Sequence, residues 1–305
     1  MRASSFVIFL SVFLTIYGMV NFYIFSRIWQ IIPQGSPVRP WFAGGFVLLA
    51  SSYILGRLLE KLTVCTASSA FIWAGSFWLG LMAYLAIGFL VADLVHGALY
   101  LGHLALPARV SALALERLYS TGAVIMLSAV IVTVGYFNAS NHTMMRLEVE
   151  ITGKKTPLKS LNIALVTDIH LGVIIGNGRF EKLVRDINAL QPDLILLAGD
   201  VVDEDLAPVI EDNVGASICE LKAKYGVFGV TGNHEYIGGV EEAVSYLVDH
   251  GITMLRDRAV TIDNAFVLAG REDLSSRQFL GANRKPLSLV LAESDPALPV
   301  ILMDH

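Results

Sequence analysis

The first half of the chain is a succession of long apolar runs. Four of them approach the roughly twenty residues that a helix needs to cross the hydrocarbon core of a bilayer, and they cover residues 6–25, 41–59, 71–92 and 118–137. Arg57 is the only charged residue within them. No cleavage pattern of a signal peptide follows the first run cleanly. The pattern therefore predicts a transmembrane domain of about four helices over residues 1–140.

The second half alternates short apolar runs with amphipathic helical patterns. The stretches "LNIALVT", "PDLILLAG" and "YGVFGVTG" have the length and composition of buried strands. Helical patterns at 179–190 and 209–224 separate them, another follows at 240–251, and strand-like stretches come last, at 252–262, 264–270 and 299–305. This order predicts a βαβαβ unit with a parallel sheet, then a mixed sheet or a second sheet packed on the first.

Composition supports a division into two domains, 1–140 and 141–305. The chain is 54% hydrophobic and 16% charged. Its first 140 residues carry seven Lys or Arg and three Asp or Glu, whereas the remainder carries fifteen and twenty-four. Because proteins that bind nucleic acid usually present a basic face, the acidic second half argues against a nucleic-acid partner.

Four spans place the N-terminus and the second domain on one side of the membrane. The positive residues on that side are Arg2, Arg57, Lys61, Arg146, Lys154, Lys155 and Lys159, and those on the opposite side are Arg27, Arg39, Arg109 and Arg117. Since loops with more Lys and Arg tend to stay inside, the excess of seven over four favours a cytoplasmic second domain. We expect an integral protein of a bacterial plasma membrane.

Asp93 and His96 follow the third apolar run. Ionisable groups inside a membrane often mark a path for protons or ions. The other runs offer Asp93 no charged partner, so both residues are predicted to lie at the membrane interface. For the same reason, transport by the membrane domain is disfavoured.

Side chains suited to binding metal follow four of the predicted strands. The residues concerned are Asp168 and His170, then Asp200 and Asp203, then Asn233, His234 and Glu235, and last Asp304 and His305. Functional groups of such sheets gather beyond the carboxyl ends of the strands, so these clusters are expected to converge. Carboxylate, imidazole and amide ligands together suit a first-row divalent metal.

The motifs "TDIHLG", "LAGDVVD", "VTGNHEY" and "ILMDH" resemble the first four motifs of the calcineurin-like metallophosphoesterases. The resemblance covers about residues 160–305, and the membrane half resembles the membrane-anchored bacterial branch of that family. "LAGRED", with Asp273, also looks like a family feature. The resemblance implies an α+β fold, a four-layer α/β/β/α sandwich preceded here by the all-α membrane domain.

The resemblance also implies a site with two divalent transition-metal ions, of Mn, Fe, Zn or Co. Asp168 and His170 would hold the first ion, Asp200 would bridge both, and the second would be held by Asn233 and His305. His234 would steady the phosphate and assist the leaving oxygen, and Glu235 would orient His234. The family has a further Gly-His-x-His motif after the position of His305, which this sequence lacks, so we expect a domain truncated at its C-terminus with two ligands missing.

The expected function is a membrane-anchored phosphoesterase. It would hydrolyse a phosphate ester or pyrophosphate with a metal-bridging hydroxide. An anchor beside the bilayer favours a lipid-linked substrate. Without the last motif, this exact chain is expected to bind metal poorly and to hydrolyse little. The alternative is a non-enzymatic membrane protein whose metal-binding domain serves as a sensor or scaffold.

Overall fold

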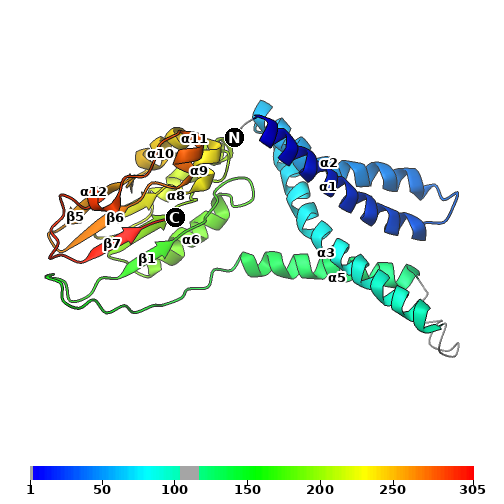
Figure 1. Ribbon diagram of the computed structural model, residues 1–305, viewed down its shortest axis with the longest axis horizontal. Helices are drawn as coiled ribbons and strands as arrows, with labels where there is room; N and C mark the ends of the chain where they lie inside the picture. Colours follow the sequence, from blue (N-terminus) through cyan, green and yellow to red (C-terminus); the bar gives the residue numbers. More distant parts are fainter. Residues whose placement is uncertain (1–2, 104–116) are drawn as a thin grey trace. The chain divides into compact units, whose positions relative to one another are not determined.

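The computed structural model describes residues 3–103 and 117–305. It divides into two units, Met1–Asn141 and His142–His305. Four long helices make up the described part of the first unit, namely α1 (Ala3–Ile31), α2 (Val38–Leu62), α3 (Thr66–His103) and α5 (Arg117–Ala139) (Figure 1). All four are long and apolar enough to cross a membrane, which confirms the prediction of four helices of that length. Arg2 and Arg109, used in the charge comparison above, lie outside the described residues.

Polar side chains turn inward in this helical unit. The indole Nε1 of Trp78 donates to Asn21 Oδ1 at 3.0 Å, and Asn21 Nδ2 donates to the carbonyl of Tyr17 at 2.9 Å. Many large apolar side chains of the same helices, such as Ile16 and Val134, face outward and are exposed. Hydrogen bonds between helices inside and apolar groups outside are the arrangement expected of helices that pack in lipid.

Asp93 has a charged partner, so the prediction that it lacks one is wrong. Its carboxylate forms an ion pair with Arg27 and accepts a hydrogen bond from the hydroxyl of Tyr23 at 2.5 Å. The prediction failed because α1 continues to Ile31 and α3 to His103, beyond the ends of their apolar runs. Both charges therefore lie on helices rather than in connecting loops. The pair lies toward the end of α1, where it joins α1 to α3.

The second unit contains a parallel sheet. Its strands β1 (Ile163–Val166), β2 (Leu194–Ala198), β3 (Val227–Val230) and β4 (Ile252–Met254) lie in that order and all run parallel. The helices between and after them are α6 (Asn177–Ala189), α7 (Ala207–Glu211), α8 (Val214–Ile218), α9 (Asn233–Gly238) and α10 (Val240–Asp249). Buried residues of α6, α8 and α10 pack with alternate residues of the sheet to form one core. The predicted βαβαβ unit is confirmed.

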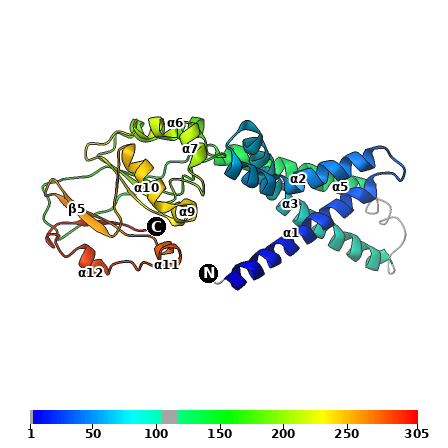
Figure 2. The same ribbon diagram turned by 90° about the horizontal axis from the view of Figure 1, so that it is seen from above.

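A second sheet packs on the other face of the first. It consists of β5 (Arg258–Ile262), β6 (Phe266–Gly270) and β7 (Val300–Met303), with β5 antiparallel and β7 parallel to β6. The core between the sheets includes Leu196, Phe228, Phe266, Leu268 and Met303. Figure 2 shows α6 and the short helix α12 (Leu287–Val290) on opposite sides of this unit. The order of layers matches the expected α/β/β/α sandwich, with short helices in the fourth layer.

Two predicted elements are broken in the structure. The helix expected over 209–224 is divided into α7 and α8 at Asn213, whose φ of 51° is left-handed. The strand expected over 252–262 becomes β4 and β5, which belong to different sheets. Asp257, with φ 47°, turns the chain between them, and its carboxylate accepts hydrogen bonds from Arg271 Nε and from the backbone N–H of Glu272 and Lys285.

Candidate metal centre

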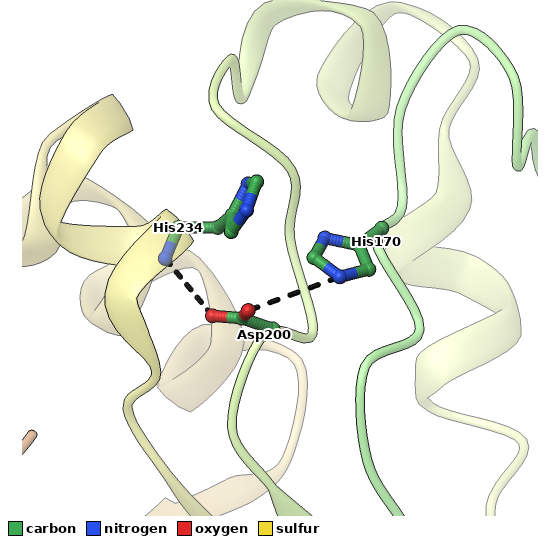
Figure 3. Close-up of side chains that lie close together, drawn as sticks. All are labelled: His170, Asp200 and His234. Carbon is green, nitrogen blue, oxygen red and sulfur yellow. Dashed lines mark hydrogen bonds and ion pairs between the residues drawn. The ribbon is translucent and has the colours of Figure 1, made fainter. Parts of the chain in front are cut away.

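The residues predicted to bind metal meet beyond the carboxyl ends of β1, β2, β3 and β7. Among the described residues, two groups of potential ligands have their ligand atoms within 4.8 Å of one another, one of His170, Asp200 and His234 and the other of Asp168, Asp200 and His305. Figure 3 shows the first group, in which the backbone N–H of His234 and the ring of His170 approach the two carboxylate oxygens of Asp200. Asp200 belongs to both groups, and it is 3% exposed. Its position between the groups is the one a bridging carboxylate would take.

Two carboxylates lie between the imidazoles of His170 and His305. His170 Nε2 is 3.9 Å from Asp168 Oδ1 and 3.8 Å from Asp200 Oδ2. His305 Nε2 is 3.7 Å and 3.5 Å from the same two oxygens. These distances are longer than the donor–acceptor distance of a good hydrogen bond, which is about 2.7–3.2 Å. Two atoms that share one tetrahedral ion at bond lengths of about 2.0–2.2 Å lie about 3.3–3.6 Å apart, so the shorter of these distances fit a shared ion.

The backbone that carries these ligands is strained. Asp168, His170 and Asp200 have φ values of 54°, 52° and 49°, in the left-handed region that residues other than glycine seldom adopt. Backbone hydrogen bonds hold the segments together, from Asp168 N to Gly199 O at 3.2 Å and from His170 N to Asp200 O at 2.9 Å. Strain of this kind concentrates at functional sites, where the surrounding structure compensates for it.

Two glycines allow the ligand loops to approach each other. A Cβ on Gly199, whose φ is +91°, would lie 2.5 Å from the ring of His305. A Cβ on Gly232 would lie 2.1 Å from Asp200 Oδ1. Any larger residue at either position would displace a predicted ligand.

His234 contacts the cluster in two ways. Its backbone N–H donates to Asp200 Oδ1 at 2.9 Å, and its Nδ1 lies 3.0 Å from Asp203 Oδ1. Its ring packs edge-to-face on that of His170, with 4.4 Å between centroids. Asp203, which the sequence analysis placed among the side chains suited to binding metal but assigned to neither ion, is thus the carboxylate that orients His234. The signal for it was its position three residues after Asp200 in "LAGDVVD".

Glu235 was expected to orient His234, but the structure gives it a different set of contacts. The carboxylate is 1% exposed and accepts hydrogen bonds from the backbone N–H of Gly232 at 2.7 Å, Val202 at 3.0 Å and Asp200 at 3.2 Å. Burial raises the pKa of Glu235, and the bonds from Val202 and Gly232 oppose that rise. Glu235 therefore joins the loop after β2 to the loop after β3.

Replacing Glu235 by alanine should loosen both loops. It would leave three buried N–H groups without their acceptor, each at a cost of about 1–3 kcal/mol. We expect amide hydrogen exchange at Val202 and Gly232 to accelerate by about a hundredfold or more. Glu235→Gln keeps an acceptor oxygen and should show a smaller effect. Unchanged exchange in the alanine variant would contradict this role.

Asp273 supports His305 from behind. Its Oδ2 lies 3.3 Å from His305 Nδ1, and its Oδ1 accepts the backbone N–H of Ser275 at 2.7 Å. Burial lowers the pKa of His305, but the carboxylates of Asp200, Asp273 and Asp168 outweigh it and hold that pKa above its usual range. The hydroxyl of Thr167, 2.6 Å from Asp168 Oδ2, is the main cause of the lowered pKa of Asp168.

Metal affinity should therefore rise with pH. A metal ion binds only the neutral form of an imidazole, so it competes with the proton for His305. Because the pKa of His305 is raised, the imidazole of the metal-free protein stays protonated up to a higher pH than an ordinary histidine does. We expect the apparent affinity to increase between about pH 6 and pH 8 and then to level off. Titration with Mn²⁺ or Zn²⁺ at a series of pH values measures this. His305→Gln should weaken binding and flatten the dependence, and an affinity independent of pH would contradict the prediction.

Asn233, the remaining predicted ligand, is the first residue of α9 and is half-buried. It lies between Gly232 and His234, both of which contact Asp200 or approach it closely. The side-chain amide of Asn233 therefore belongs to the loop that borders Asp200 and the other predicted metal ligands.

Comparison with known proteins agrees with this geometry. Residues 161–305 match the model of the calcineurin-like phosphoesterase family. They form a calcineurin-like phosphoesterase domain. An uncharacterized metallophosphoesterase of Aquifex aeolicus is 33% identical over 160 residues, which are 52% of this chain and 59% of that protein. A bovine transmembrane protein with a metallophosphoesterase domain is 30% identical over 194 residues, 59% of this chain and 43% of its own length.

A third relative has a named substrate. The UDP-2,3-diacylglucosamine pyrophosphatase of Chlamydia muridarum is 30% identical over 94 residues, 30% of this chain and 28% of that protein. The chain spans between about a third and three fifths of the length of three curated relatives that it matches. Relatives come from bacteria and from animals.

Proposed function

We propose that this protein is a membrane-anchored, metal-dependent phosphoesterase that hydrolyses a phosphate ester or pyrophosphate bond. The observation that carries the proposal is the sharing of Asp200 by two overlapping groups of metal ligands within the phosphoesterase domain. A buried carboxylate among three imidazoles and a second carboxylate is a donor set that fits divalent transition metals. The four apolar helices provide the anchor.

We propose that different residues of the chain bind each of the two ions. Asp168 and His170 would hold one ion, Asn233 and His305 the other, and Asp200 both. When bound, such ions polarise the phosphoryl group and lower the pKa of a bound water. Mn, Fe, Zn and Co are all compatible with the nitrogen and oxygen donors present.

His234 is proposed to act on the substrate rather than on the metals. The carboxylate of Asp203 accepts the hydrogen bond from Nδ1, which fixes the ring and leaves Nε2 to face the substrate. In its protonated form, Nε2–H would donate to a phosphoryl oxygen as charge develops there, and then give its proton to the leaving oxygen. Glu235 would position the loops that carry Asp200 and His234.

A lipid-linked phosphate or pyrophosphate is the proposed class of substrate. The anchor keeps the domain beside a bilayer, and one relative is named for a diacylated sugar nucleotide. The test is release of phosphate or of a phosphorylated product, with the protein in nanodiscs and Mn²⁺, Zn²⁺, Fe²⁺ or Co²⁺ supplied in turn. Aryl phosphodiesters serve as soluble probes. Metal binding without hydrolysis of any probe would instead support a metal-binding sensor or scaffold.

The phosphoesterase domain is proposed to face the cytoplasm, on the charge difference described above. Reporter fusions after Lys61 and Lys154 should both be active inside the cell. An alkaline phosphatase fusion, active only outside, should be silent at both positions and active after Arg39. A fusion after Lys154 that is active only outside would overturn the orientation without affecting the metal site.

A further inference from the structure

Residues 274–292 differ in charge from the rest of their domain. The stretch carries Arg277, Arg284 and Lys285 and contains no Asp or Glu. The domain around it, 141–305, has twenty-four acidic and fifteen basic residues. Arg284 forms an ion pair with Asp304, whereas Arg277 and Lys285 are exposed. These two exposed positive charges in an acidic domain would attract a partner of negative charge.

The same stretch exposes large apolar side chains. Helix α11 (Ser275–Phe279) and its flanks expose Leu274 by 68%, Phe279 by 46% and Leu280 by 54%. Ile237 of α9 is 46% exposed, and the ring of its neighbour Tyr236 lies 6.3 Å from that of Phe279. We call these four exposed residues, Ile237, Leu274, Phe279 and Leu280, the apolar rim. Exposed apolar residues that gather on adjoining helices mark an interaction surface more often than single ones do.

The apolar rim is built on the elements that carry the metal centre. Helix α9 begins with Asn233 and His234. Asp273, which contacts His305, accepts the backbone N–H of Ser275 at the start of α11. Whatever covers the rim would therefore lie beside the metal centre.

We propose that the apolar rim, together with Arg277 and Lys285, docks on the anionic surface of the bilayer that holds the four helices. Interfacial segments combine basic residues with Leu and Phe, because the basic groups meet anionic lipid while the apolar groups enter the boundary of the acyl chains. The anchor raises the effective concentration of bilayer surface at the domain. Docking would bring the metal centre to the level of lipid phosphates. This inference goes beyond the proposed hydrolysis and does not depend on it.

The test measures contact with lipid directly. Leu280→Cys, in a full chain with Cys65→Ser and Cys219→Ser, is labelled with an environment-sensitive fluorophore and placed in nanodiscs. Some nanodiscs contain phosphatidylcholine alone, others also phosphatidylglycerol, and each type is made with and without a lipid that carries a quencher near the headgroup. Val248→Cys is the matched control, since Val248 is 50% exposed but lies on α10, which packs on the first sheet. Retained metal binding confirms that the labelled chains are folded.

The label at position 280 should be quenched about twofold or more in nanodiscs with phosphatidylglycerol, and less in phosphatidylcholine alone or at high salt. The label at 248 should be quenched in neither. Arg277→Glu with Lys285→Glu should reduce quenching at 280. Equal quenching at 280 and 248 would overturn the proposal. A blue-shifted label at 280 without quenching would also overturn it, since protein would then cover the rim, either a second copy or another part of the chain.

Discussion

Asp200→Asn is expected to remove both metal ions and to lower the rate of hydrolysis by about 10³-fold or more. That is at least as large as the rate loss on removing one hydrogen-bond donor to the transition state, which is about 10²–10³-fold. Asp200 is the residue that both ligand groups share, so its loss affects both ions at once. Asparagine keeps the shape of the side chain and an oxygen that can accept the backbone N–H of His234. The expected loss is therefore one of charge and coordination rather than of folding.

Metal content per chain, measured by mass spectrometry of the purified protein, separates the alternatives. Asp263→Asn is the matched control, because Asp263 is an exposed carboxylate with a similar left-handed backbone, in the turn between β5 and β6. It should retain metal and rate. Loss of one ion with retention of the other in Asp200→Asn would show that Asp200 does not bridge.

The convergence of the ligands was predictable because it follows from topology. Parallel strands end at one edge of their sheet, so residues that follow β1, β2 and β3 meet wherever the intervening chain runs. The sequence shows this at Asp168, Asp200 and Asn233, each just beyond an apolar run. The four long helices were predictable for a similar reason, since length and hydropathy define a span without any tertiary contact.

The contacts that individual polar side chains make were less predictable. Glu235 is next to His234 in sequence, which suggested that it orients the imidazole. Instead its carboxylate points to the amides of Val202 and Gly232, a choice decided by how two loops come together. The pair of Arg27 and Asp93 joins residues that are 66 positions apart. The break at Asp257 depends on donors that lie more than a dozen residues further along the chain.

His234→Ala is expected to keep both metals and to lose about 10²-fold or more in rate, as other transition-state donors do. Asp203→Asn should cause a smaller loss, about tenfold, because the ring remains but its Nδ1 partner is no longer charged. If His234 protonates the leaving oxygen, its loss matters most for substrates whose leaving group is a poor one. The rate loss should therefore be larger for an alkyl ester than for an activated aryl ester.

The competing assignment is that His234 binds a metal, since it forms one of the two candidate groups with His170 and Asp200. Metal content distinguishes the two. A ligand would lose metal on substitution, and the rate loss would be the same for alkyl and aryl esters because both need the ion equally. A positioned acid would keep metal and show the dependence on the leaving group. The hydrogen bond of 3.0 Å between Nδ1 and Asp203 fixes one ring nitrogen and leaves Nε2 open, as it would in a metal ligand or in a positioned acid. Metal content and the dependence on the leaving group therefore decide between the two roles.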